Sequence, residues 1–438
     1  MRLGLILLFL LLSHVPCAAQ KGFQFVTHKS KVVIPFQLIN NLIFIPVNVN
    51  GVELNFLLDT GVEETILLSL EDKAEVRFFD VQKIMLRGLG SAEPIEGMKS
   101  ANNELSVNGI VDKSHDLYIV LDQSFNFSSH IGIPVNGIIG YHFFKDNLVE
   151  VDYDKRRLVV FRDTQKRRKK IKDKYIPVPI TVEKSKPYVV ADVTVDGRTE
   201  PAKLLLDLGN SDALWLFKGS RFEIPAQHFE DYLGKGFSGD IHGNRARITD
   251  MKIDRFAFDR PIVAFPDSAS VKSVNMVKDR VGSIGGEVLR RFDLVMDYAH
   301  KTLYLRRGRA FDEPFHYNMS GIEMQHQGTQ WVQETVAMQT VYLENTFDES
   351  GTKKDNFKYK FSLKPVYSIS SVRKDSPADL CGLQKDDVVV SINNSQAYKL
   401  TLQKINELLK SEDGKWIYIE VDRGGQILKF RFQLKAML

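Results

Sequence analysis

The chain contains little cysteine for its length. Only two of its 438 residues are cysteines, Cys17 and Cys381, so an internal disulfide is excluded if Cys17 leaves with the N-terminal segment. Neither a cysteine pair nor a Cys/His cluster has the spacing of metal ligands. We therefore expect neither a metal site nor another cofactor.

Long apolar runs are also missing. The run from Leu3 to Leu12 is too short to span a bilayer, which takes about 20 apolar residues. No later segment is long and apolar enough, so we expect no transmembrane segment. The net charge of +4 is small for this length and does not point to a nucleic-acid partner. An apolar content of 43% is typical of a globular protein with real cores.

The N-terminus has the pattern of an export signal. Arg2 precedes the apolar run, and Cys17-Ala18-Ala19 offers a small-residue cleavage site before Gln20. We expect residues 1–19 to be a signal peptide and the mature protein to be periplasmic or extracellular. A lipid anchor on Cys17 is the rival interpretation, which Pro16 fits poorly.

One short stretch occurs twice. Residues 56–61 read Phe-Leu-Leu-Asp-Thr-Gly, and residues 204–209 read Leu-Leu-Leu-Asp-Leu-Gly. Alone, either stretch would be a strand that ends in an ordinary turn. The surroundings repeat as well: Gly140 follows Asp59 by 81 residues, and Gly285 follows Asp207 by 78. Gly140 follows Ile138-Ile139, and Gly285 follows Ser283-Ile284. The same features at nearly the same separations indicate an internal duplication.

The repeated unit is rich in strand patterns. Alternating apolar and polar residues surround hairpin turns at Asn50-Gly51 and Asp196-Gly197. We expect a mainly β protein with one lobe over residues 20–165 and a second over 175–312. The basic stretch 166–174 between them is predicted to be a solvated linker. A nucleic-acid or membrane patch is the alternative for this stretch.

Two aspartates held close together favour one kind of chemistry. Repulsion between like charges raises one pKa, so Asp59 and Asp207 would share a proton. The ionised member can take a proton from a water molecule, while the protonated member stabilises the oxyanion of a carbonyl. Such a pair hydrolyses amides without a metal and without a nucleophilic serine or cysteine.

On these motifs the first 310 residues or so resemble the aspartic peptidases of the retroviral and pepsin type, especially bacterial single-chain members with two retropepsin-like repeats. The resemblance implies two β lobes, a cleft between them, and a catalytic dyad of Asp59 and Asp207. It implies flaps at 87–91 and 234–239. The residues expected to support the dyad are Thr60, Gly61, Gly209, Asn210, Gly140 and Gly285, and those expected in the flaps are Gly88, Leu89, Gly90, Gly236 and Phe237.

Two residues depart from the family pattern. Leu208 stands where the family has Thr or Ser, so one of two reciprocal hydroxyl bonds cannot form. Ser283 replaces an apolar residue before Ile284-Gly285. Asn210 and Ser211 are candidates for compensating polar contacts.

The last part of the chain, residues 313–438, resembles an α+β PDZ domain of the kind attached to bacterial envelope proteases. The matching residues are Ser376-Pro377-Ala378, Gly382-Leu383, Asp387 and Ile392-Asn393. The polar stretch around 325–360 reads as an insertion. The peptide-binding residues expected from the resemblance are Gly321, Ile322, Glu323 and Met324, whose backbone would hold a peptide carboxylate; a plain strand start is the alternative.

These observations favour an exported aspartic endopeptidase, an enzyme whose PDZ module recruits peptide or unfolded-protein substrates by their C-termini. With two repeats in one chain, we expect a monomer. A non-catalytic peptide binder of the same fold, which Leu208 would favour, and a scaffold centred on the PDZ domain remain as alternatives.

Overall fold

The computed structural model describes residues 22–68, 70, 75–86, 95–121, 127–219, 221–236, 239–271, 276–337 and 357–438, with the backbone alone at 334–337 and 357–360. The predicted signal peptide, with Cys17, lies outside the described residues, and so does the stretch 348–356. In the described part of the chain no helix is long and apolar enough to cross a membrane.

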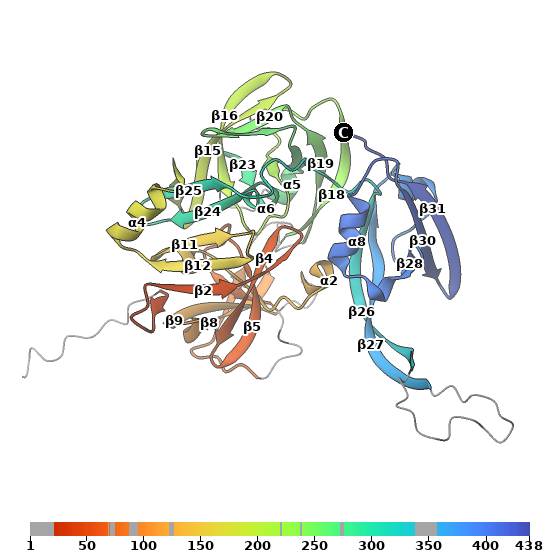
Figure 1. Cartoon of the computed structure of the whole chain (residues 1–438), viewed down its shortest axis with the longest axis horizontal. Coiled ribbons are helices and arrows are strands. Elements are labelled where there is room, and N and C mark those ends of the chain that lie inside the picture. The colour runs from red at the N-terminus through yellow and green to blue at the C-terminus, as the bar shows by residue number, and fades with distance from the viewer. Residues whose placement is uncertain are drawn as a thin grey trace, which may run out of the picture.

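The described residues form a mainly β molecule built on four sheets (Figure 1). Two related sheets make two lobes, a third sheet joins the lobes, and a fourth forms the C-terminal domain. This arrangement confirms the predicted fold class of two aspartic-protease-like lobes followed by a PDZ-type domain.

The first lobe is a nine-stranded sheet with the main order β1-β9-β6-β10-β5-β4-β8-β7. Asn50 and Gly51 adopt positive φ angles of 50° and 94°, which the tight turn between β4 and β5 requires. Beyond this turn β5 runs to Leu58 and delivers Asp59 to the end of the strand. The strands are β1 (Gln24–Phe25), β3 (Gln37–Ile39), β4 (Leu42–Val49), β5 (Val52–Leu58), β6 (Thr65–Leu67), β7 (Gln82–Leu86), β8 (Ile95–Val107), β9 (Ile110–Val120) and β10 (Gly137–Ile139).

The second lobe repeats this plan as a ten-stranded sheet. Asp196 and Gly197 make the corresponding turn with φ angles of 47° and 78°. As in the first lobe, the strand that leads to the aspartate pairs in parallel with a later strand that a glycine follows directly. The strands are β14 (Thr181–Glu183), β15 (Lys186–Val195), β16 (Arg198–Leu206), β17 (Leu214–Leu216), β18 (His228–Gly236), β19 (Gly239–Arg247), β20 (Asp250–Ile253), β21 (Phe256–Asp259), β22 (Ile262–Pro266) and β23 (Arg280–Ile284).

A six-stranded sheet joins the lobes through the antiparallel pairing of β11 with β24. It holds the two aspartate loops in a fixed relation because each lobe contributes three of its strands. The strands are β2 (Lys31–Pro35), β11 (Asn147–Asp152), β12 (Arg157–Arg162), β13 (Ile176–Pro179), β24 (Phe292–Asp297) and β25 (Thr302–Arg307). Short helices complete the lobes: α2 (Phe127–Ile131), α3 (Tyr141–Phe144), α5 (Ser268–Val271) and α6 (Gly286–Leu289).

The basic stretch 166–174, predicted as a solvated linker between the lobes, is largely helical and mostly exposed. Helix α4 (Gln165–Lys172) begins at Thr164, whose side chain accepts a hydrogen bond from Arg167 N. Ile171 is buried in a small core with Tyr175 and Tyr304. The stretch is therefore a helix of mostly basic residues that packs on the protein through one buried apolar side chain, Ile171.

The C-terminal domain has a sheet of order β26-β27-β28-β30-β31 with β29 beside β28. Helix α8 (Leu402–Leu409) buries Leu402, Ile405 and Leu409, which are spaced along one helical face. The elements are β26 (Ile322–Ala337), β27 (Phe357–Val372), α7 (Pro377–Leu380), β28 (Val388–Ile392), β29 (Ser395–Gln396), the 3₁₀ helix η1 (Ala397–Lys399), α8 (Leu402–Leu409), β30 (Trp416–Arg423) and β31 (Gln426–Gln433).

Part of the insertion predicted around 325–360 is regular structure. Residues 325–337 continue β26, which pairs with β27 along its whole length and forms an arm (Figure 1). Exposed apolar side chains on β27, such as Phe361 and Leu363, alternate with polar ones, and Trp331 on β26 is exposed as well. Residues 325–333 of β26 show no such alternation, which explains why the sequence pattern predicted an insertion there.

The connection to the C-terminal domain is anchored to the second lobe. Arg291 is fully buried and donates hydrogen bonds to the carbonyl oxygens of Phe311, Glu313 and Pro314. Its guanidinium also lies 3.8 Å from the centroid of the Phe315 ring. Residues 311–315 therefore pack with the second lobe, although the predicted PDZ boundary falls at 313.

Candidate active site

Asp59 and Asp207 meet at the floor of one cleft between the lobes. Asp59 N–H donates to the Ile139 carbonyl and Asp207 N–H to the Ile284 carbonyl, each at 2.9 Å. The cleft has a volume of about 1490 Å³ and is lined by both aspartates. The two Oδ1 atoms lie 2.9 and 3.0 Å from the position that a Cβ on Gly61 would take.

The two carboxyl groups titrate as a pair. A hydrogen bond joins them, and each also accepts a backbone N–H: Gly61 N to Asp59 Oδ1 at 2.6 Å, and Gly209 N to Asp207 Oδ1 at 3.1 Å. Burial and the charge of Asp207 raise the pKa of Asp59 to about 7. Burial also raises the pKa of Asp207, while the positive charges of Arg280 and Lys186 oppose that rise.

The predicted glycines stand where chain segments approach closely. A Cβ on Gly140 would overlap with the carbonyl oxygens of Val62 and Asp59. A Cβ on Gly285 would overlap with those of Asp212 and Asn210 in the same way. Each glycine thus lets its own lobe close tightly around the aspartate loop.

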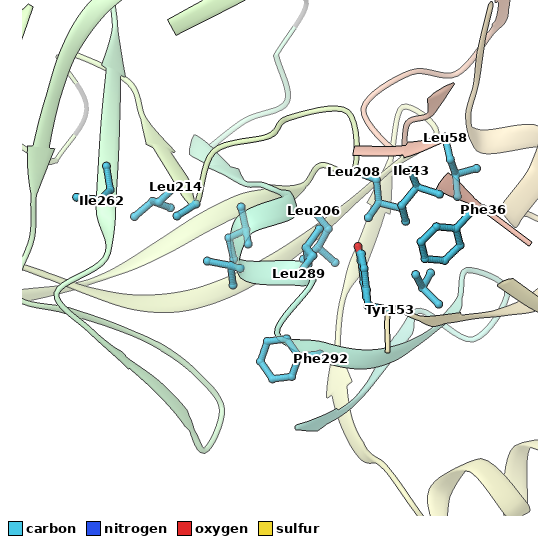
Figure 2. Close-up of a cluster of buried hydrophobic side chains, with 14 of the residues drawn as sticks. Phe36, Ile43, Leu58, Tyr153, Leu206, Leu208, Leu214, Ile262, Leu289 and Phe292 are labelled. Atoms are coloured by element: carbon cyan, nitrogen blue, oxygen red, sulfur yellow. The ribbon is translucent and has the colours of Figure 1, made fainter. Parts of the chain in front are cut away.

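Thr60 makes the only side-chain bridge of its kind between the two loops in the described part of the chain. It is fully buried, donates from Oγ1 to the Leu206 carbonyl at 2.6 Å, and accepts from Leu208 N at 3.0 Å. Leu208, its counterpart, is also fully buried but packs among apolar side chains that include Ile43 and Leu58 (Figure 2). The dyad is therefore held by polar contacts from one side and by apolar packing from the other.

The second departure from the expected pattern has a polar partner. Asn210 Nδ2 donates to Ser283 Oγ at 3.4 Å, and Asn210 Oδ1 accepts from Asp212 N at 2.9 Å. Ser211 contributes through its carbonyl, which accepts from Asn41 Nδ2 of the first lobe at 2.9 Å. The loop that follows Asp207 is thus fixed by its own amide and by the opposite lobe.

Two hairpins line the cleft at corresponding places in the lobes. Strands β7 and β8 form one, and β18 and β19 form the other, which closes by the pairing of Gly236 with Gly239. Met85, Leu86 and Leu233 line the cleft from these hairpins. The predicted flap residues Gly88, Leu89, Gly90 and Phe237 lie outside the described residues.

The predicted carboxylate loop of the C-terminal domain has its backbone donors engaged. Asn318 Oδ1 accepts from Ser320 N at 3.0 Å and from Gly321 N at 3.3 Å. Ile322 N donates to Ser320 Oγ at 3.1 Å. The loop's own side chains thus occupy the position that a peptide carboxylate would take in such a loop.

The two residues that follow this loop face the cleft. Glu323 and Met324 line it together with Lys410 of the region after α8. Burial and the charge of Asp231 raise the pKa of Glu323 to about 7. The four predicted peptide-binding residues are thus brought together at the start of β26, next to the cleft that holds the dyad.

A chain of ion pairs connects this loop with the aspartate loop of the second lobe. Arg373 donates to the Asn318 carbonyl at 3.0 Å and lies 3.3 Å from Asp231 on β18. Asp231 also pairs with Arg245 on β19 at 2.8 Å, and Arg245 pairs with Asp212 at 2.9 Å. These side chains are largely buried, so solvent screens the ion pairs only weakly.

Sequence reasoning missed two cations beside the dyad. Lys186 and Arg280 both line the cleft. The charge of Lys186 lowers the pKa of both aspartates, and the charge of Arg280 lowers the pKa of Asp207. They belong to no motif. Only an alignment of the two repeats strand by strand would have shown a basic residue where the first lobe has an apolar one.

A second group that looks catalytic is closed to solvent. His115 bonds to Asp112 through Nδ1 at 2.8 Å and to Thr65 through Nε2 at 2.7 Å, but all three residues are buried. This network therefore has a structural role.

Comparisons with known proteins agree with this geometry at two places in the chain. The crystal structure of an aspartic proteinase from Irpex lacteus is similar with a TM-score of 0.42 and 12% identity, over 65% of this chain and 99% of that one. No curated protein matches the sequence. Residues 45–143 match the family model described as aspartyl protease, and residues 368–423 match the model described as PDZ domain. The chain therefore combines an aspartyl-protease domain with a PDZ domain.

Proposed function

We propose that the chain is an exported aspartic endopeptidase in which Asp59 and Asp207 activate a water molecule for attack on a peptide bond. The observation that carries this proposal is the meeting of the two buried carboxyl groups in one cleft, where both Oδ1 atoms lie within 3.0 Å of the position that a Cβ on Gly61 would take. The signal-like segment 1–19 supports export to the periplasm or the outside of the cell.

The two aspartates have different tasks in this mechanism. Asp59, with a pKa of about 7, keeps the shared proton and donates a hydrogen bond to the carbonyl oxygen of the scissile amide. Asp207, whose ionised form Arg280 and Lys186 favour, takes a proton from the attacking water. The protonated dyad then returns a proton to the leaving amine, so no covalent intermediate is needed.

The PDZ domain is proposed to bring peptide or unfolded-protein segments to this cleft. Its strand β26 and the end of helix α8 border the cleft through Met324, Asn406 and Lys410. A peptide C-terminus can bind at Gly321 only if Asn318 Oδ1 first leaves the loop. Recruitment thus requires a local rearrangement, while the protein itself acts as a monomer.

Hydrolysis of an unstructured peptide mixture between about pH 3 and pH 8 tests the proposal, since this range spans the titration of a carboxyl pair. Wild-type protein is expected to cut the peptides, and Asp59→Asn or Asp207→Asn is expected to abolish cutting. Asp192→Asn on β15 removes a carboxylate that is not among the cleft-lining residues and serves as the control. Failure of the wild type to cut, or equal cutting by the variants, refutes the proposal.

A non-catalytic peptide binder is the second candidate, and the burial of Leu208 in place of a second bridging hydroxyl is the observation that favours it. Binding and turnover separate the two candidates. A binder holds peptides in the cleft but releases them intact, whereas the enzyme converts them to fragments.

A further inference from the structure

Each lobe presents one row of side chains to the cleft, and the row of the first lobe is apolar. Leu57, two residues before Asp59, pairs across the sheet with Phe44 on one side and Ile138 on the other. The surrounding cluster is formed by Ile39, Leu42, Phe44, Leu57, Ile66, Val120, Ile131, Val135 and Ile138. The first lobe therefore offers a hydrophobic subsite.

The second lobe builds the corresponding row in the same register. Leu205, two residues before Asp207, pairs with Tyr188 on one side and with Ser283 on the other. Trp215 continues the row beyond Ser283. Because the two rows share this register, residues of the two lobes can be compared one by one.

The comparison shows two apolar positions replaced by cations. Leu42 stands two residues before Phe44 on the first lobe, and Lys186 stands two residues before Tyr188 on the second. Val135 precedes Gly137 by two residues, and Arg280 precedes Gly282 by two. Lys186 and Arg280 both line the cleft.

The two cations are held differently. Arg280 Nε donates to the Gly282 carbonyl at 3.1 Å, and its guanidinium lies 5.1 Å from the centroid of the Phe217 ring, so the side chain is fixed. The amino group of Lys186 has no ion pair or hydrogen bond with any residue in the described part of the chain. The nearby Glu183 forms its ion pair with Lys203 instead, with 2.7 Å between Oε1 and Nζ.

The charge of the dyad alone does not neutralise the two cations beside it. Two aspartates that share one proton carry a single negative charge, whereas Lys186 and Arg280 carry two positive charges. Glu64 faces Lys186 from the first lobe but makes no ion pair with it in the described part of the chain. A partly desolvated, unpaired cation is costly, and an incoming carboxylate would offset that cost.

We propose that the half of the cleft formed by the second lobe binds a substrate carboxylate at Lys186 and Arg280, while the half formed by the first lobe takes a large apolar residue. This inference deepens the proposed function and rests on it. The carboxylate can be a Glu or Asp side chain or the C-terminus of a short peptide. Arg280, with its fixed planar guanidinium, would orient the carboxylate, and Lys186 would supply a second charge.

Matched peptides test the inference in the full-length protein. Each pair differs only by Glu or Gln at one position near a cleavage site that carries a large apolar residue. We expect kcat/KM to favour Glu by about tenfold or more at one position, which corresponds to one charge-assisted contact of about 1.4 kcal/mol. A free and an amidated C-terminus on the same peptides show which source of carboxylate is recognised.

Variants then assign the preference to the two cations. Lys186→Gln and Arg280→Gln are each expected to reduce the Glu preference several-fold, and Lys186→Glu to turn it into a preference for Lys. Lys252→Gln removes an exposed cation on β20, outside the cleft lining, and is expected to leave the preference unchanged. Equal rates on Glu and Gln peptides at every position, whether the C-terminus is free or amidated, overturn the inference. A Glu preference that persists in both Lys186→Gln and Arg280→Gln also overturns it.

Binding separates this inference from the proposed function. The affinity of peptides with a reduced, uncleavable bond is measured by fluorescence anisotropy for the Glu and Gln forms. Tighter binding of the Glu form without any hydrolysis of normal peptides refutes the peptidase and supports the carboxylate subsite. Hydrolysis with equal binding of both forms supports the peptidase and refutes the subsite.

Discussion

Thr60→Val removes the hydroxyl that bridges the two aspartate loops while it keeps the shape of the side chain. The variant leaves the Leu206 carbonyl and the Leu208 N–H without their buried partner. An unsatisfied buried polar group costs about 1–3 kcal/mol, so two of them are expected to lower the free energy of unfolding by about 2–6 kcal/mol. Because Leu208 offers no second hydroxyl, no other side chain bridge replaces the lost one within the described loops.

Urea unfolding measures the stability, and peptide hydrolysis measures the effect on the dyad. Thr60→Ser is the matched control, since it keeps the hydroxyl and loses one buried methyl group at about 1 kcal/mol. We expect kcat to fall strongly in Thr60→Val and little in Thr60→Ser. Equal stability and equal kcat in the two variants would refute the view that this hydroxyl holds the dyad.

Three further predictions concern the site and its connection to the PDZ domain. In Gly209→Ala the new methyl group would overlap with the Asp59 carboxyl group, so kcat/KM is expected to fall about 100-fold, as for a displaced catalytic group. Burial and Asp207 raise the pKa of Asp59 from 3.8 to about 7. Activity is therefore expected to fall as pH rises through 7, where Asp59 loses its proton, and a pH profile of kcat checks this. Lys186→Gln removes a cation that lowers the pKa of Asp59, so it should move this fall in activity to higher pH. The same shift predicts that the stability contributed by protonated Asp59 is fully present below its unfolded pKa of 3.8 and is lost as pH rises through about 7. Arg373→Ala is expected to loosen the loop at Asn318 because it removes a bond of 3.0 Å and the ion pair with Asp231; hydrogen exchange at 318–322 should rise, and unchanged exchange there would contradict the link.

Local patterns and the repeat made much of the fold and the dyad predictable. Hairpin turns at Asn50-Gly51 and Asp196-Gly197 are visible in sequence because few residues adopt positive φ angles readily. The near-equal distances from Asp59 and Asp207 to their glycines predicted an internal duplication, and the family resemblance implied that Gly140 and Gly285 support the dyad. In the structure each glycine lies against its aspartate loop.

Features set by tertiary contacts were not predictable in the same way. The basic stretch around Lys166 is dominated by charge, and a single buried residue, Ile171, does not make an apolar face that a periodicity would detect. Lys186 lies on a strand whose sequence pattern is ordinary, and its place beside the dyad depends on pairing across three strands. Residues 325–333 of β26 bury no side chain and show no apolar–polar alternation, so the sequence carried no strand signal there.

A double-mutant cycle on peptide hydrolysis tests the central claim, that Asp59 and Asp207 act as one unit. It compares kcat/KM for wild type, Asp59→Asn, Asp207→Asn and the protein with both substitutions. Groups that act together are strongly non-additive, so each single variant and the double variant are expected to fall to the same residual rate. Single-variant losses that add up in the double variant, or hydrolysis that persists without either carboxylate, would contradict the shared-proton dyad.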